Sequence, residues 1–207
     1  MLEKEVKIEL GNKHAFQQAL NLFTRASDKE IQLVRQINHY LDTGDLTLAR
    51  SLVMFRLRLS EEAGKEKKAL LTFKSGTQIE EGYFQSKEIE SMISPELSSD
   101  LLADPCSLYK LDLPPIITLR KEYGELPLEL VGILHNERRI FYIEGYTVEL
   151  DTMKFQDGEE AYEVELESEN PRQAREWCLA CLKAAGIGDI KPATCTKFQR
   201  LTRKMGM

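Results

Sequence analysis

The first ten residues alternate between charged and apolar side chains. One face carries Glu3, Glu5, Lys7 and Glu9, and the other carries Leu2, Val6, Ile8 and Leu10, with Lys4 as the exception. A period of two is typical of a β-strand with one apolar face. We therefore predict a strand over residues 1–10, and any fold for this chain has to accommodate its charged face.

The same alternation returns in later segments of the chain. These segments are residues 30–43, 53–60, 68–74, 83–92, 129–143, 146–151 and 162–168. A flat sheet would expose such faces to water and would need no regular arrangement of charge. Unpaired charges inside a closed sheet cost several kcal/mol each, so a barrel has to neutralise them. The repetition predicts a closed sheet with a charged interior.

Two kinds of charge recur on these strands. Carboxylate pairs occur at Glu3/Glu5, Glu88/Glu90, Glu149/Asp151 and Glu163/Glu165, and cations occur at Lys7, Arg56/Arg58, Lys68, Lys74, Arg138 and Lys197. An isolated pair usually indicates only a solvated strand face. The whole set predicts an acidic zone for a hard divalent cation beside a basic zone for phosphate. That combination is typical of phosphoryl transfer.

Composition excludes several classes of protein. The net charge of −6 argues against a protein that coats nucleic acid. We find no apolar run long enough to cross a membrane and no signal-peptide pattern, so we expect a cytoplasmic protein with no membrane partner. The four cysteines are Cys106, Cys178, Cys181 and Cys195. Cys178 and Cys181 form a CxxC on a predicted helix, but a second CxxC is missing, so we expect four buried thiols rather than a zinc site.

Helical segments are predicted outside the strands. Residues 13–23 follow the capping residue Asn12, and a helix over residues 170–185 begins at Asn170-Pro171 and ends at Gly186. Its predicted buried stripe is Trp177, Cys181 and Leu182. Residues 94–111 read as broken helix, whereas residues 116–123 fit either a strand or a helix.

The ordered motifs resemble those of a known family. Glu3-x-Glu5-x-Lys7 is similar to the ExExK signature of the CYTH superfamily, the triphosphate tunnel metalloenzymes. The other motifs follow in family order: Asn38-His-Tyr-Leu-Asp42-Thr43, Arg56-x-Arg58, Leu71-Thr-Phe-Lys74, Glu88-x-Glu90, Asn136-x-Arg138, Glu149-Leu-Asp151, Glu163-x-Glu165 and Lys197. The resemblance implies an α+β fold, an eight-stranded antiparallel β-barrel with helices packed outside, over one domain of residues 1–207.

The resemblance also implies roles for individual residues. It assigns the phosphates to Lys7, Arg56, Arg58, Lys74, Arg138 and Lys197, one metal ion to Glu3, Glu5 and Glu165, and a second ion or the attacking water to Asp151 and Glu163. The expected catalytic residues are Glu163, Asp151 and Lys7, while Glu90 and Glu149 would orient cations. Arg139 would replace Arg138 if the register differed by one residue, because such a slip exchanges the two faces.

The implied activity is hydrolysis of a triphosphate with Mg²⁺ or Mn²⁺. The expected substrate is inorganic triphosphate, or the triphosphate of a small organic compound such as thiamine triphosphate. The alternative is a class IV-type adenylate cyclase that converts ATP to cyclic AMP and pyrophosphate. A third possibility, a non-enzymatic polyphosphate binder, would not need the carboxylates. We expect a monomer or homodimer that does not bind nucleic acid.

Overall fold

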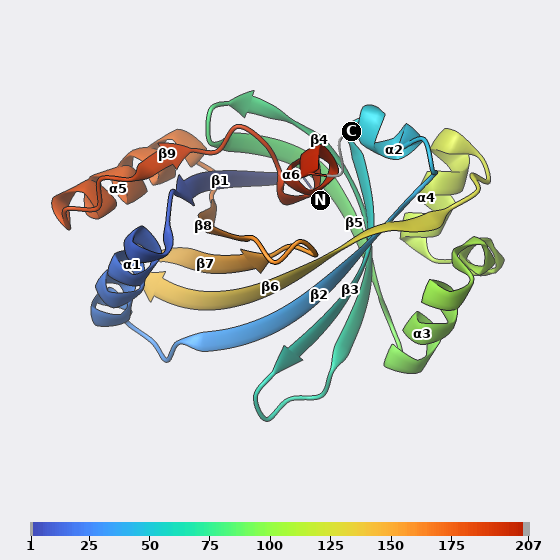
Figure 1. The fold of residues 1–207 in the computed structure, drawn as a ribbon, viewed down its shortest axis with the longest axis horizontal. Coiled ribbons are helices and arrows are strands. Elements are labelled where there is room, and N and C mark those ends of the chain that lie inside the picture. Colours follow the sequence, from blue (N-terminus) through green and yellow to red (C-terminus); the bar gives the residue numbers. More distant parts are fainter. Residues whose placement is uncertain (1, 205–207) are drawn as a thin grey trace.

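The strands form one closed antiparallel sheet in the computed structural model, which describes residues 2–204 (Figure 1). The barrel strands are β1 Leu2–Leu10, β2 Gln32–Asp42, β3 Val53–Glu62, β4 Lys68–Glu80, β5 Tyr83–Ile93, β6 Glu129–Ile143, β7 Tyr146–Lys154 and β8 Glu160–Glu167. Their order is β5-β4-β3-β2-β6-β7-β8-β1, and pairing of β1 with β5 closes the ring. This confirms the eight-stranded barrel. Met1 of the first predicted strand and residues 205–207 of the predicted domain lie outside the described residues.

One edge of β1 is shared by two partners. β5 pairs with Leu2–Val6, and the short strand β9, Ile190–Pro192, pairs with residues 8–10. β9 was not predicted from the sequence, because three residues are too few to show a period. At the junction, the Lys7 amide donates to the Gly82 carbonyl (2.9 Å) and the Ala193 amide donates to the Lys7 carbonyl (2.9 Å). The backbone of Lys7 is therefore fixed from two segments.

Two helices, α1 Lys13–Ala26 and α5 Pro171–Ala184, pack against the outer face of β1 and β6–β8. Both begin where the sequence predicted, because the side chains of Asn12 and Asn170 accept hydrogen bonds from the first turns. Their buried residues meet the outward apolar residues of the strands, as Phe23 does with Phe141. The apolar face of the alternating strands thus points outward, which leaves the charged face inside.

A second group of helices covers the other side of the barrel. α2 Thr47–Arg50, α3 Pro95–Ala103, the 3₁₀ helix η1 Pro105–Lys110 and α4 Pro114–Tyr123 pack around the outward residues of β3 and β4 (Figure 1). The undecided residues 116–123 are helical. Pro114 and Pro115 start α4, and Gly124, with φ +75°, ends it. None of the described helices is long and apolar enough to cross a membrane.

Two predictions about the cysteines and their helix are wrong in detail. The buried positions of α5 include Ala174, Cys178 and Leu182, whereas Trp177 and Cys181 are half-buried. The stripe follows a spacing of four from Ala174, a small residue that lets the helix approach the sheet. The thiol of Cys106 is exposed rather than buried, because it lies in η1 on the outside.

The last helix, α6 Lys197–Lys204, packs against the inner face of the barrel at one end. Phe198 stacks on Tyr40 with ring centroids 4.7 Å apart. A Cβ atom on Gly132 of β6 would lie only 2.7 Å from the side chain of Leu201. The absence of a side chain at Gly132 therefore leaves space for α6. Phe198 and Leu201 thus add apolar side chains to the interior at this end.

Candidate active site in the barrel

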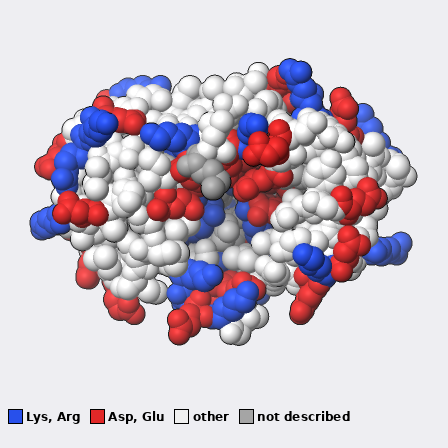
Figure 2. Space-filling model, turned by 180° about the vertical axis from the view of Figure 1, so that it is seen from behind, with Lys and Arg blue, Asp and Glu red and all other residues white. Residues whose placement is uncertain are grey.

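The inner face of the barrel surrounds a charged cavity of about 610 Å³. Ten of its lining residues were predicted as site residues: Glu3, Glu5, Lys7, Arg56, Arg58, Lys74, Glu90, Arg138, Glu165 and Lys197. From outside, acidic side chains gather round a hollow near the middle of one face, with basic side chains beside them (Figure 2). A volume of this size is ordinary for a small-molecule site.

Three carboxylates at the β1 end of the cavity lie close together. One oxygen each from Glu3, Glu5 and Glu167 falls within 4.8 Å of the other two. Burial raises the pKa of Glu3 above its usual range, and the carboxyls of Glu88 and Glu5 raise it further although Lys74 lies beside it. Such a cluster repels itself, and oxygen ligands alone are the donor set that suits Mg²⁺ or Mn²⁺. The cluster therefore fits a hard divalent cation.

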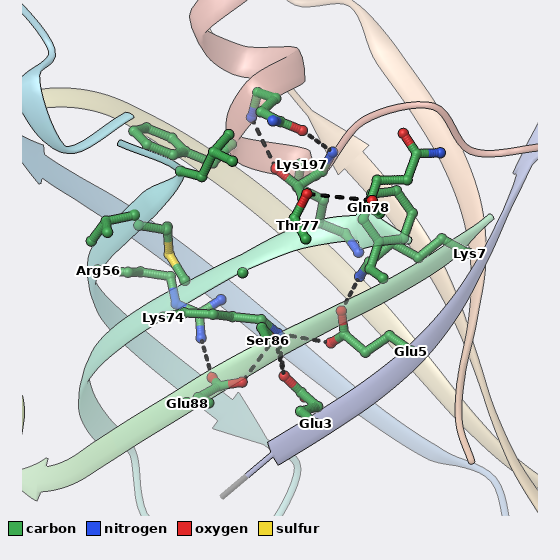
Figure 3. A pocket seen from close by; sticks show the side chains of 18 of the residues that line it. Glu3, Glu5, Lys7, Arg56, Lys74, Thr77, Gln78, Ser86, Glu88 and Lys197 are labelled. Atoms are coloured by element: carbon green, nitrogen blue, oxygen red, sulfur yellow. Dashed lines mark hydrogen bonds and ion pairs between the residues drawn. The ribbon is translucent and has the colours of Figure 1, made fainter. Parts of the chain in front are cut away.

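Lys74 lies among the carboxylates of this end (Figure 3). Its ammonium contacts Glu3 and lies 2.9 Å from Glu5 and 3.1 Å from Glu88. Burial alone would raise the pKa of Glu5, but Lys7 and Lys74 lower it to about 2. Glu5 is thus ionised and held between two cations, and it remains within reach of the cluster.

A second, deeper cluster joins β6, β7, β8 and α6. Arg138 binds Asp151 through two hydrogen bonds of 2.8 and 2.7 Å and also contacts Glu165. Lys197 lies 2.9 Å from Asp151, 2.9 Å from Glu163 and 2.7 Å from Glu165. Burial raises the pKa of Glu163, whereas Arg138 and Lys197 outweigh burial and lower the pKa of Asp151 to about 2. These carboxylates hold the two cations in place.

The predicted separation into an acidic and a basic zone is wrong. Cations and carboxylates alternate: Lys7 contacts Glu165 and lies 2.8 Å from Glu5, and Arg138 contacts carboxylates of two neighbouring strands. This pairing could not be predicted from the sequence, because the pattern of one strand does not determine which charged residue of the neighbouring strand lies opposite. Pairing across strands neutralises the interior locally, as buried charges require.

Arg58 differs from the other cations that line the cavity. Its guanidinium donates to Asn38 Oδ1 (2.8 Å), and none of the described carboxylates lies within ion-pair distance of it. Burial lowers its pKa to about 10, with Arg56 and Arg138 adding to the effect. A partly buried cation that forms no ion pair with the described carboxylates is suited to binding an anion.

The structure places three predicted residues behind the cavity wall. Asp151, Glu163 and Glu149 contact Lys197 and Arg138 instead of lining the cavity. Arg138 points inward, whereas Arg139 points outward over the ring of Phe16, which settles their register. In this arrangement Asp151 and Glu163 form ion pairs with Lys197 and do not line the cavity.

Sequence reasoning gave no site role to several residues of the interior. Glu88 contacts Lys74, Ser86 donates to Glu3 (3.2 Å), and Arg200 donates to Glu9 (2.8 Å). Arg200 had a usable signal, because it follows Lys197 by three residues and shares its helix face. Glu88 was predicted only as a member of the Glu88/Glu90 carboxylate pair, without a role of its own. Ser86 had no such signal, since a serine on a strand carries no signature.

Comparisons with known proteins agree with this arrangement. A family model, described as the CYTH domain, matches residues 1–195. The chain belongs to the CYTH family. A search of curated proteins finds no significant match. The family assignment confirms the resemblance on which the residue roles were based, although those roles remain proposals.

Solved structures share the CYTH fold of this chain. HpAC1 from Hippeastrum, a candidate adenylyl cyclase described as having a dominant triphosphatase activity, has a TM-score of 0.85 at 24% identity, covering 98% of this chain and 96% of that one. A candidate adenylate cyclase from Bacillus halodurans has a TM-score of 0.71 at 22% identity, covering 96% and 97%. The RNA triphosphatase domain of a mimivirus mRNA capping enzyme has a TM-score of 0.53 at 13% identity, covering 89% of each chain. At these identities the likeness shows the fold alone.

Proposed function

We propose that this protein hydrolyses a triphosphate inside the barrel with a divalent cation, Mg²⁺ or Mn²⁺. One observation carries the proposal: a single cavity contains a carboxylate cluster, Glu3, Glu5 and Glu167, together with Arg58, a cation that forms no ion pair with the described carboxylates. A protein that only bound polyphosphate would need carboxylates to hold its cations, but it would not need three clustered carboxylates that can take a divalent cation. Inorganic triphosphate is the simplest substrate, and organic triphosphates such as thiamine triphosphate share the recognised group.

We assign the phosphates to the cations that line the cavity. These are Lys7, Arg56, Arg58, Lys74, Arg138 and Lys197. Arginine gives forked contacts to phosphate, and charge on the leaving pyrophosphate is stabilised by cations already in place. The carboxylates of Glu3, Glu5 and Glu167 would hold the divalent cation, which supplies charge to the phosphoryl oxygens and activates water when bound.

Water activation would involve the deeper cluster. Asp151 and Glu163 are fully buried and engaged by Lys197. Phosphate competes for the same ammonium group, so we propose that Lys197 shifts onto the substrate as it binds. The carboxylate of Glu163 or Asp151 is then free to orient the attacking water or to bind a second cation. Glu165 keeps Lys7 in place and Glu149 keeps Arg138 in place.

Product analysis tests the activity directly. The protein is incubated with Mg²⁺ or Mn²⁺ and inorganic triphosphate, thiamine triphosphate or ATP, and phosphate, pyrophosphate and cyclic AMP are measured. We expect phosphate and pyrophosphate from triphosphate, and none in excess EDTA. Cyclic AMP with pyrophosphate from ATP would show the cyclase instead. Tight binding without turnover would show a polyphosphate binder.

Substitution of Arg58 by methionine should separate binding from stability. Loss of a charge-assisted hydrogen bond costs about 1.5–3 kcal/mol, so the Kd for inorganic triphosphate should rise about tenfold or more. The free energy of unfolding should change by only about 1 kcal/mol, because the partner left behind is the uncharged Asn38. Calorimetric titration in EDTA measures the Kd without turnover, and urea unfolding measures stability.

The matched control is Arg35→Met, on the neighbouring strand but with a side chain 68% exposed on the outside of the barrel. It should bind triphosphate as the wild type does. An Arg58→Met variant with unchanged affinity would remove Arg58 from the binding site.

A further inference from the structure

Three side chains on neighbouring strands, Arg56, Thr72 and Glu90, form a row across the inner face of the barrel, with the threonine between the cation and the carboxylate. In the pairing of β3, β4 and β5, Arg56 lies opposite Thr72, and Thr72 lies opposite Glu90. Directly opposed side chains on one sheet face are close enough to interact. Thr72 is completely buried, whereas Arg56 and Glu90 line the cavity.

The Thr72 hydroxyl uses both of its hydrogen-bonding capacities in this row. It donates to Glu90 Oε1 at 2.9 Å and accepts from Arg56 Nη2 at 3.3 Å. The same Arg56 nitrogen lies farther from the carboxylates, 3.7 Å from Glu88 and 3.8 Å from Glu90. The hydroxyl is therefore the closest of these anchors for the guanidinium.

Strand formation alone does not explain a threonine here. Valine has the same shape and an equally high β-propensity, and Leu70, two residues earlier on the same face, shows that apolar side chains are accommodated. A buried hydroxyl is costly unless it is hydrogen-bonded. Because β-branching restricts χ1, this hydroxyl stays between its two partners.

Arg56 retains a donor that is not used inside the protein. Its Nε is buried and has no hydrogen-bond partner among residues 2–204. The guanidinium lines the cavity and is anchored at Nη2, so its orientation toward an incoming anion is set at that nitrogen. The orientation depends on the group that holds Nη2.

We infer that Thr72 is a positioning residue. Its hydroxyl links Glu90 to Arg56 by hydrogen bonds and thereby fixes the guanidinium in the orientation that binds a phosphate of the substrate. This inference rests on the proposed triphosphate function. It adds a residue that contacts no substrate itself and acts only through Arg56.

The test compares Thr72→Val and Thr72→Ser with the wild type in hydrolysis of inorganic triphosphate with Mg²⁺. Thr72→Val should raise KM about tenfold with little change in kcat, because an interaction common to ground and transition state is weakened. Thr72→Ser keeps the hydroxyl and should stay close to the wild type. Thr152→Val, which removes a hydroxyl from the outward face of β7, should change neither parameter.

A double-mutant cycle with Arg56→Ala shows whether Thr72 acts through Arg56. In the Arg56→Ala background, Thr72→Val should cause no further loss of triphosphate affinity in EDTA. An undiminished loss in that background, a wild-type KM for Thr72→Val, or an equal defect in Thr72→Ser would each overturn the inference. If Thr72→Val does not fold, Thr72→Ala removes the same hydroxyl without the second methyl. A wild-type protein that neither binds nor cleaves triphosphate would instead refute the proposed function.

Discussion

Glu5→Gln should lose at least about a hundredfold of Mg²⁺-dependent triphosphate hydrolysis while keeping the fold. Replacing a residue that only supports a metal ligand costs about 10–100-fold in metal affinity or activity. Glu5 is proposed as a ligand itself, so its loss should cost at least as much. Glutamine preserves the shape of the side chain but removes the charge of one of the three clustered carboxylates, Glu3, Glu5 and Glu167. The measurement is a Mg²⁺ titration of phosphate release, with circular dichroism to verify the fold.

The control for this experiment is Glu137→Gln. Glu137 pairs with Arg139 (2.6 Å) on the outside of the barrel, so its loss should not change the Mg²⁺ response. Full activity of Glu5→Gln at the wild-type Mg²⁺ requirement would contradict the metal assignment.

The same titration decides which β8 carboxylate is the third ligand. The resemblance assigns Glu165, whereas the geometry groups Glu167 with Glu3 and Glu5. Glu165 instead contacts Lys7, Arg138 and Lys197. If the geometry is right, Glu167→Gln raises the Mg²⁺ requirement. Glu165→Gln should then reduce triphosphate affinity at saturating Mg²⁺, because three substrate-binding cations lose a fixed partner.

Arg138→Met should produce a large loss of stability. Removing one partner of a buried ion pair costs about 3–5 kcal/mol, because the remaining charge has no compensation. Arg138 contacts three carboxylates, Asp151, Glu165 and Glu149, whose side chains are 0%, 7% and 20% exposed. For a chain of this size the melting temperature should fall by about 6–20 °C.

Arg139→Met is the matched comparison, since Arg139 follows directly in β6 but faces outward and pairs with Glu137. A pair on the outer surface contributes about 1 kcal/mol or less. Thermal unfolding of the two variants should therefore differ clearly. Equal melting temperatures would show that Arg138 does not neutralise the buried carboxylates.

Local sequence patterns predicted the elements of this fold well, and the reason is physical. Alternation with a period of two fixes which side chains share a face of a strand, as in Glu3, Glu5 and Lys7 on β1. The cap at Asn12 likewise acts within one helical turn. Such information is contained in a few neighbouring residues, so it can be read without the tertiary structure.

The surroundings of a charged residue inside the barrel could not be predicted from the pattern of its own strand. Glu163, Glu165 and Glu167 share one face of β8 and have the same pattern, yet one lies behind Lys197, one between cations and one in the carboxylate cluster. Their environments depend on which strands lie opposite and on where α6 packs. Those are contacts between residues far apart in the chain.

The sequence by itself determined that this chain forms strands with one apolar and one charged face, and that the charges match the motifs of the CYTH family. Only the tertiary structure decided how the charges are paired, that Arg58 forms no ion pair with the described carboxylates, and that Thr72 lies between Arg56 and Glu90. The physical reason is that strand pattern fixes the direction of a side chain, whereas register and closure of the sheet fix its neighbours.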